Sequence, residues 1–176
     1  MRQRPQIQAV LPESDLTICS LKVDDAPELL AFYRSLSPAV VRVFLPTDYV
    51  SPDAIREHLW MVRCGDCVSL GLVNSAGRIL GHAFVQGIRS ARPMLGIGLH
   101  ESVMGKGYGK RLLRQLLDET DRLRVPSVHL NVVKTNARAE KLYRMLGFVI
   151  VGQATFRKRD DSWAMERSRP DDCPTP

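Results

Sequence analysis

Apolar residues recur along the chain with two different periods, which separate the expected strands from the expected helices. Alternation and short apolar runs predict strands at Leu16 to Leu21, Cys67 to Val73, Arg78 to Gln86, Met94 to His100, Val128 to Val132, Phe148 to Val151 and Ser162 to Met165. Apolar spacings of three and four, together with capping residues, predict helices at Asp25 to Leu36, Pro52 to Cys64, Gly107 to Arg124 and Ala137 to Leu146.

The order of these elements indicates an α/β fold. Two helices follow the first strand, three strands come next, and the second half alternates strand, helix, strand, helix and two strands. A strand-helix-strand unit of this kind brings its two strands into parallel pairing, so we expect one parallel pair around the helix that begins at Gly107.

The chain has 176 residues, 44% of them apolar and 25% charged, which is typical of one globular domain. We therefore expect a single domain over residues 1–176, with flexible ends at 1–12 and 170–176, where no periodic pattern is present. The longest apolar runs are too short to cross a bilayer, and the N-terminus lacks the continuous apolar stretch of a signal peptide. These features predict a cytoplasmic protein without a membrane partner.

A net charge of +6 and an isoelectric point near 9.4 favour an anionic partner. Aromatic residues are few and are not interleaved with a basic stripe, which speaks against nucleic acid. Cys64 and Cys67 have the spacing of a zinc or redox pair, but no two further ligands occur at similar spacing. We expect no metal site and interpret the two residues as reduced thiols at a turn.

A glycine-rich loop, Met104-Gly105-Lys106-Gly107-Tyr108-Gly109-Lys110, lies between a predicted strand and the longest predicted helix. Backbone amides at a helix N-terminus bind anions, and glycines let a diphosphate approach the backbone closely. The loop lacks the Ser or Thr of a GxxxxGK[ST] nucleotide-binding loop, and several strands precede it, unlike a dinucleotide fingerprint. It is therefore a candidate site for a different phosphorylated ligand, although a purely structural turn has the same glycines.

Met104 to Gly109 resembles the Q/R-x-x-G-x-G/A motif of the GNAT acetyltransferase superfamily, in which backbone amides hold the pyrophosphate of acetyl-CoA. The run formed by Asn136, Ala139, Leu142, Tyr143, Gly147 and Phe148 is similar to the N-x-x-A-x-x-L-Y-x-x-x-G-F run of the same family. The likeness covers Leu16 to Met165 in element order, and its diagnostic residues lie between Met94 and Val151. It implies a mixed, mostly antiparallel sheet flanked by helices, with the parallel pair around the cofactor-binding helix.

The resemblance also implies roles for individual residues. Tyr143 would be the general acid for the departing thiolate, a role that suits a phenol, although the same residue fits the apolar face of its helix. Asn136 would contact the cofactor, and it is equally suited to cap the helix that follows it. The implied cofactor-binding residues are Ile97, Gly98 and Leu99 for the pantetheine arm, Gly105, Lys106, Gly107, Tyr108, Gly109 and Lys110 for the pyrophosphate, and Asn136.

Two positions depart from the family pattern. Met104 stands where Gln or Arg is usual, and Asn131 stands where some members that acetylate protein N-termini have a glutamate base. Glu101 and His100, at the end of the strand before the loop, are the candidate replacements, and a water molecule is the alternative. The buried-looking histidines His58, His82 and His129 have a structural interpretation.

The expected activity is transfer of an acetyl group from acetyl-CoA to a primary amine on a small molecule or a peptide. Gly96 and Gly98 share one face of their strand with His100, which predicts an open surface where the acyl group or the acceptor approaches. The competing hypothesis is a non-catalytic CoA-binding sensor or regulatory module. The sequence does not identify the acceptor, and it leaves monomer and homodimer equally open.

Overall fold

The computed structural model describes residues 16–44, 51–156 and 159–170. The ends that the sequence predicts to be flexible lie outside the described residues, apart from Pro170. Among the helices that the model describes, none combines the length and apolar character that a bilayer crossing requires.

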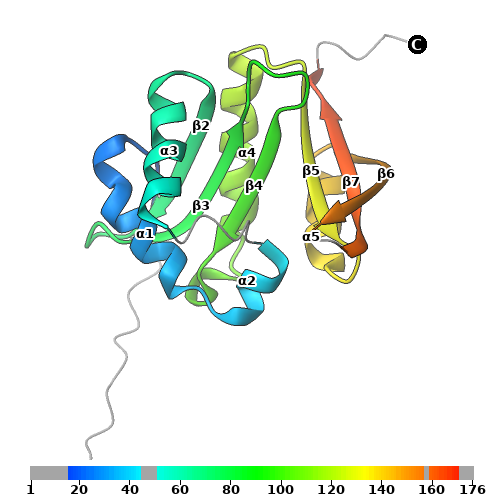
Figure 1. Cartoon of the computed structure of the whole chain (residues 1–176). Helices are drawn as coiled ribbons and strands as arrows, with labels where there is room; N and C mark the ends of the chain where they lie inside the picture. Colours follow the sequence, from blue (N-terminus) through cyan, green and yellow to red (C-terminus); the bar gives the residue numbers. More distant parts are fainter. Residues whose placement is uncertain (1–15, 45–50, 157–158, 171–176) are drawn as a thin grey trace, which may run out of the picture.

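Seven strands form one sheet, in the spatial order β1-β2-β3-β4-β5-β7-β6 (Figure 1). Their bounds are β1 Thr17–Ser20, β2 Cys67–Val73, β3 Ile79–Gln86, β4 Met94–Leu99, β5 Ser127–Val133, β6 Val149–Phe156 and β7 Arg159–Ser168. All neighbouring strands pair antiparallel except β4 and β5, which are parallel. The predicted α/β fold and its parallel pair are thus confirmed.

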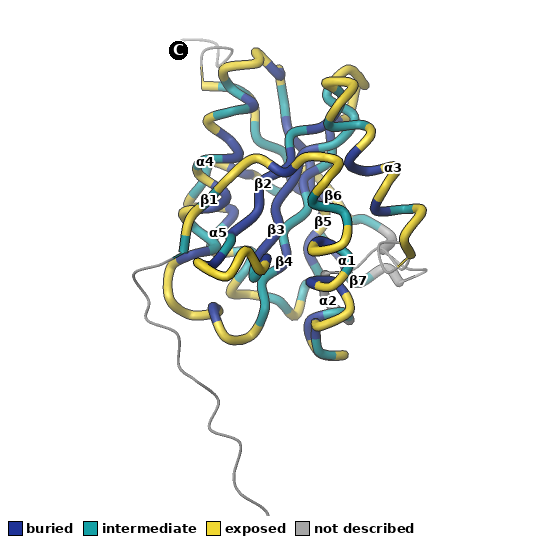
Figure 2. Tube along the Cα trace, turned by 90° about the vertical axis from the view of Figure 1, so that its left-hand side faces the viewer, coloured by how far each residue is buried: buried dark blue, intermediate teal, exposed yellow. Residues whose placement is uncertain are grey.

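Helices cover both faces of this sheet. Their bounds are α1 Ala26–Ser35, α2 Pro38–Phe44, α3 Pro52–Arg63, α4 Tyr108–Arg122 and α5 Ala137–Met145. In Figure 2, α4 and α5 lie on one face of the buried strands, and α1, α2 and α3 lie on the opposite face. One apolar core, which includes Leu112, Leu116 and Phe148, fills the α4 and α5 side, and a second, which includes Leu29, Phe32 and Leu59, fills the other.

Helix α2 is absent from the sequence-based expectation. We predicted two helices between the first two strands, and the described residues form three. Three of the seven residues of α2 are valines, whose branched side chains favour strands, and the apolar spacing is too short to establish a helical period. The sequence does carry a helix start signal there, Ser37 followed by Pro38.

Strands β4 and β5 separate soon after they pair. Their described register consists of Met94 opposite His129, supported by a hydrogen bond from the His129 amide to the Pro93 carbonyl. Beyond this point β4 remains paired with β3, as far as Leu99, but no described residue of β4 pairs with β5. The two strands diverge toward their carboxyl ends (Figure 1), which leaves one edge of β4 free for another partner.

Candidate functional site

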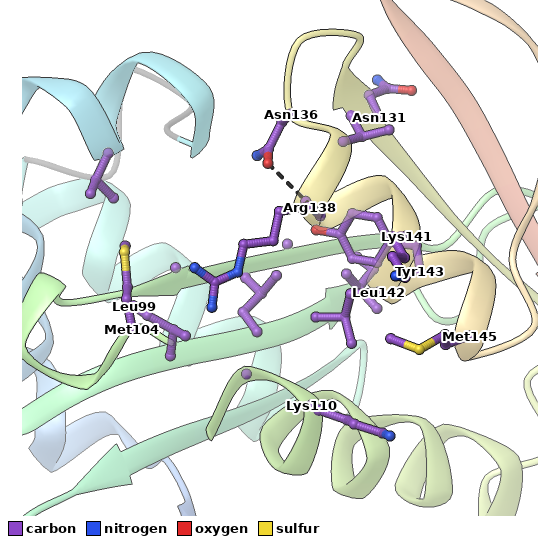
Figure 3. A pocket seen from close by; sticks show the side chains of 18 of the residues that line it. Leu99, Met104, Lys110, Asn131, Asn136, Arg138, Lys141, Leu142, Tyr143 and Met145 are labelled. Atoms are coloured by element: carbon purple, nitrogen blue, oxygen red, sulfur yellow. Dashed lines mark hydrogen bonds between the residues drawn. The ribbon is translucent and has the colours of Figure 1, made fainter. Parts of the chain in front are cut away.

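A pocket of about 840 Å³ lies where β4 and β5 diverge (Figure 3). Its lining comes from β4, the glycine-rich loop, the start of α4, β5, α5, two residues of β3, Phe84 and Gln86, and a single residue of α2, Val40. The pocket therefore extends along the unpaired edge of β4 and reaches both faces of the sheet.

The glycine-rich loop forms one wall of this pocket. Gly105 and Gly107 have φ angles of 82° and 84°, in the left-handed region that glycine adopts without strain. Gly107 is the N-cap of α4 and has no side chain to accept the first amide hydrogens of the helix. A bound anion would supply those acceptors, as expected at the N-terminus of a fifteen-residue helix.

The pocket brings together most of the predicted cofactor-binding residues. It is lined by Ile97, Gly98, Leu99, Gly105, Gly107, Gly109, Lys110 and Asn136. Lys106 and Tyr108 do not line it; the ring of Tyr108 is buried in the α4-side core, and the Arg111 guanidinium lies 5.6 Å from its centroid. Any contact of Tyr108 with a ligand would therefore come from its backbone.

Arg138 is a site residue that the sequence analysis did not find. It belongs to the first turn of α5, and Figure 3 shows its side chain reaching across the pocket toward Met104. Its Nη2 atom lies 3.6 Å from the position that a Cβ atom would take on Gly105. A basic residue in the first turn of the helix that follows β5 was the available signal, because that turn faces the glycine-rich loop.

Asn136 lines the pocket and also caps α5. Its side-chain oxygen accepts a hydrogen bond of 3.2 Å from the amide of Ala139, drawn as a dashed line in Figure 3. The capping role is therefore present in the structure, and it places the side chain at the pocket wall.

Tyr143 combines a core position with access to the pocket. Only 8% of the residue is exposed, and its ring packs edge-on against Phe148 with centroids 5.9 Å apart. Its hydroxyl group points into the pocket from α5 in Figure 3. Burial raises the pKa of Tyr143 to about 12, so the phenol keeps its proton at neutral pH and is available as a donor.

The two candidate bases lie outside the pocket lining. His100 forms a hydrogen bond of 2.8 Å between its Nδ1 atom and the Ser102 hydroxyl. Glu101 accepts a hydrogen bond of 3.1 Å from the Ser37 amide. Hydrogen bonding by Ser37 holds the pKa of Glu101 below its usual value, which makes this carboxylate a weaker proton acceptor.

The expectation of an open surface over Gly96 is wrong. The Phe84 ring covers this glycine, and a Cβ atom there would lie 2.5 Å from the Cζ atom of Phe84. Gly98 is buried, although it lines the pocket. Asn131, on β5, is exposed and lines the same pocket, so an uncharged amide occupies the place of the family's glutamate.

The remaining candidates have structural surroundings. His58 and His82 are buried and are joined through the Ser69 hydroxyl. Burial raises the pKa of the Cys67 thiol to about 12, which disfavours the thiolate that a redox or metal site requires. Within residues 16–44, 51–156 and 159–170, no group of three or more His, Cys, Asp or Glu residues is arranged to hold a metal ion.

Two relatives that match this chain in sequence are N-acetyltransferases. The chain is 30% identical over 82 residues to the ribosomal protein bS18 alanine N-acetyltransferase of Escherichia coli strain K12, a match that covers 47% of this chain and 53% of that protein. It is 37% identical over 82 residues to the N-alpha-acetyltransferase RimI of Mycobacterium tuberculosis, which covers 44% and 50%. The chain thus spans about half the length of the relatives it matches.

The fold extends the similarity to the rest of the chain. The crystal structure of a ribosomal-protein-S5-alanine acetyltransferase from Vibrio fischeri superposes with a TM-score of 0.77 at 15% identity, over 91% of this chain and 96% of that one. The family model described as "Acetyltransferase (GNAT) family" matches residues 30–148. The chain therefore belongs to the GNAT acetyltransferase family.

Proposed function

We propose that this protein is an N-acetyltransferase that transfers the acetyl group of acetyl-CoA to a primary amine by direct attack on the thioester. One observation carries the proposal: the left-handed glycines at the head of α4 and the buried phenol of Tyr143 open onto the same pocket. An anion-binding loop and a proton donor are the two groups that this reaction needs from the protein.

Acetyl-CoA, the acyl donor, would lie along the edge of β4 that does not pair with β5. Ile97, Gly98 and Leu99 line the pocket beyond the last described pair with β5, so their backbone groups on that edge would be available to the amides of the pantetheine arm. The amides of Gly105 to Gly109 would hold the diphosphate, and Lys110 and Arg138 add positive charge beside it.

Tyr143 would act as the general acid that protonates the departing sulfur. The amine nitrogen forms a bond to the thioester carbon while the carbon–sulfur bond breaks, and the departing sulfur takes the phenolic proton. The nitrogen loses a proton to water or to a base, and the phenol is reprotonated from solvent. The raised pKa of Tyr143 keeps the phenol protonated before each turnover, so an O–H donor is available to the departing sulfur.

The acceptor is a primary amine carried by a peptide or a small molecule. The names of the sequence relatives favour an α-amino group of a protein. Residues from the α1 to α3 side of the pocket, Val40, Phe84, Met94, Gln86 and Asn131, offer apolar surface and neutral amides to such a group.

A non-catalytic CoA-binding sensor is the second candidate, and Asn131 is the observation that favours it, because an amide cannot take the amine's proton. Release of free thiol from acetyl-CoA across a panel of amines and N-terminal peptides distinguishes the two. We expect amine-dependent release that the variant Tyr143→Phe loses. Binding of CoA by calorimetry without release from any amine would support the sensor, and no binding would refute both candidates.

A further inference from the structure

Glu101 connects two parts of the chain that border the pocket. It begins a short 3-10 helix, Glu101–Val103, immediately after β4 and His100. Its Oε1 atom accepts the hydrogen bond from the backbone amide of Ser37, 64 positions earlier in the chain. The segment that leaves the pocket is thus attached to the segment that precedes α2.

Ser37 lies immediately before α2 and is hydrogen-bonded to its first turn. Its carbonyl accepts the amide of Val41 at 3.0 Å, and its hydroxyl lies 3.5 Å from the amide nitrogen of Val40. Helix α2 contacts β4, and Figure 1 shows it beside the carboxyl end of that strand. The carboxylate of Glu101 therefore restrains the first turn of a short helix that is anchored at the end of β4.

That first turn supplies part of the pocket wall. Val40 lies in it, is only 8% exposed and lines the pocket. Helix α2 has seven residues, and isolated helices of this length are unstable, so its orientation depends on tertiary contacts: the packing of Val40 and Val41 in the core that includes Leu29, and the hydrogen bond at Ser37. A contact at Ser37 can therefore control where Val40 stands.

We propose that Glu101 is a positioning residue, which docks α2 onto the end of β4. It thereby fixes the position of Val40 in the part of the pocket wall that would contact the acceptor amine. The inference rests on the proposed acetyltransferase function and reassigns Glu101 from the role of general base. Its side chain is 42% exposed and lies outside the pocket lining, whereas a general base must reach the attacking amine directly or through water.

Substitution by glutamine separates the two roles. The side-chain oxygen of Glu101→Gln still accepts the Ser37 amide but cannot take up a proton, whereas Glu101→Ala loses both abilities. We expect Glu101→Gln to keep the wild-type kcat and an acceptor KM within about threefold of the wild type, and Glu101→Ala to raise the acceptor KM by about tenfold, the effect of losing the hydrogen bond altogether. The KM for acetyl-CoA should not change in either variant.

The matched control is Glu119→Gln, which removes an exposed carboxylate that pairs with Arg122 on α4. It should leave all parameters unchanged. A loss of kcat in Glu101→Gln as large as that in Glu101→Ala, with a changed pH profile, would identify a base and overturn the proposal. Wild-type acceptor KM in both Glu101 variants would overturn it as well.

Amide hydrogen exchange tests the contact without reference to activity. In the free protein, Glu101→Ala should accelerate exchange at Val40 and Val41, and Glu101→Gln should not. This result would stand if the protein proved to be a sensor without transferase activity, so failure of the proposed function and failure of the positioning role are distinguishable. Equal exchange in all three proteins would rule out docking by Glu101.

Discussion

The guanidinium of Arg138 lies over Gly105, with its Nη2 atom 3.6 Å from the point where a Cβ atom would sit on that glycine. Met104 occupies the loop position where the family usually has Gln or Arg, and it lines the pocket beside Arg138. The glycine-rich loop has no basic residue at position 104, and Arg138 of α5 brings a positive charge to the same place. We expect Arg138 to bind the diphosphate of the donor.

Replacing Arg138 with alanine should weaken CoA binding about tenfold, because a charge-assisted hydrogen bond contributes roughly 1.5–3 kcal/mol and this side chain is exposed. Calorimetric titration with CoA measures the change. The control is Arg144→Ala on the same helix, whose side chain is paired with Glu140 and does not line the pocket. Equal affinity in the two variants would exclude Arg138 from the site.

Gly107 and Gly109 should respond differently to alanine. Gly107 has a φ of 84°, where a Cβ atom costs of order 1 kcal/mol in strain and would face the space reserved for phosphate oxygens. Gly109 has no positive φ, and its Cβ atom would meet only the flexible end of Leu99 at 3.2 Å. We expect Gly107→Ala to lose most of the affinity for CoA and Gly109→Ala to retain it, as measured by calorimetry; the reverse order would contradict an anion site at Gly107.

The sequence predicted the elements with strong periodicity and missed those fixed by tertiary contacts. Leu112, Leu113, Leu116 and Leu117 repeat at helical spacing, so α4 could be located to within two residues at each end. Helix α2 contacts β4, and the Ser37 amide just before it is hydrogen-bonded to Glu101; neither contact is visible in a local pattern.

The residues of the site also divide into those that local motifs predict and those that only tertiary contacts bring together. The glycine-rich loop and Tyr143 have spacings that local motifs define, and the structure places them at one pocket. Arg138 belongs to the site only because β4 and β5 diverge and bring the start of α5 opposite the loop. The face over Gly96 was mispredicted because period two gives the direction of a side chain but not the ring, Phe84, that packs over it from the next strand.

Tyr143→Phe should lower kcat by about 10²- to 10⁴-fold, the contribution of a general acid, while the KM for acetyl-CoA changes little. The ring contact with Phe148 persists in the variant, so the melting temperature should remain close to that of the wild type. Because the pKa of Tyr143 is about 12, the phenol should not produce the basic limb of the pH–rate profile below about pH 10. Retention of wild-type kcat by the variant would remove Tyr143 from the mechanism.

Valine at Gly98 should block turnover. This glycine is buried, lines the pocket and lies opposite His82 of β3, so a branched side chain would overpack this part of the pocket wall. We expect acetyl transfer to be lost while the loop still binds CoA. The control Gly152→Val adds its side chain where no atom lies within 4 Å of the new Cβ, on the edge strand β6, and should be active. Unchanged kinetics in Gly98→Val would contradict the proposed approach of the acceptor.

His58 and His82 should make the protein sensitive to acid. The His58 Nε2 atom lies 3.0 Å from the Ser69 hydroxyl oxygen, which lies 2.8 Å from the Nε2 atom of His82, and the Nδ1 atom of His82 lies 2.6 Å from the Tyr33 hydroxyl oxygen. Burial lowers the pKa of His58 to about 4 and that of His82 well below its usual value. Both side chains are therefore neutral in the folded state.

These lowered pKa values make the folded protein less stable as the pH falls. Above about pH 6.5 the two histidines are neutral in both states, and their contribution to stability is complete. As the pH falls, the unfolded chain binds protons that folded His58 does not bind until about pH 4, so the free energy of unfolding decreases. His58 alone accounts for about 3 kcal/mol over this range, and His82 adds to it in the same direction.

Urea unfolding between about pH 7 and pH 4.5 measures this slope. The variant His58→Gln cannot titrate, so its stability should fall less steeply with pH than that of the wild type, even if its stability at neutral pH is lower. Equal slopes for wild type and His58→Gln would mean that His58 accepts its proton in the folded protein as readily as in the unfolded chain.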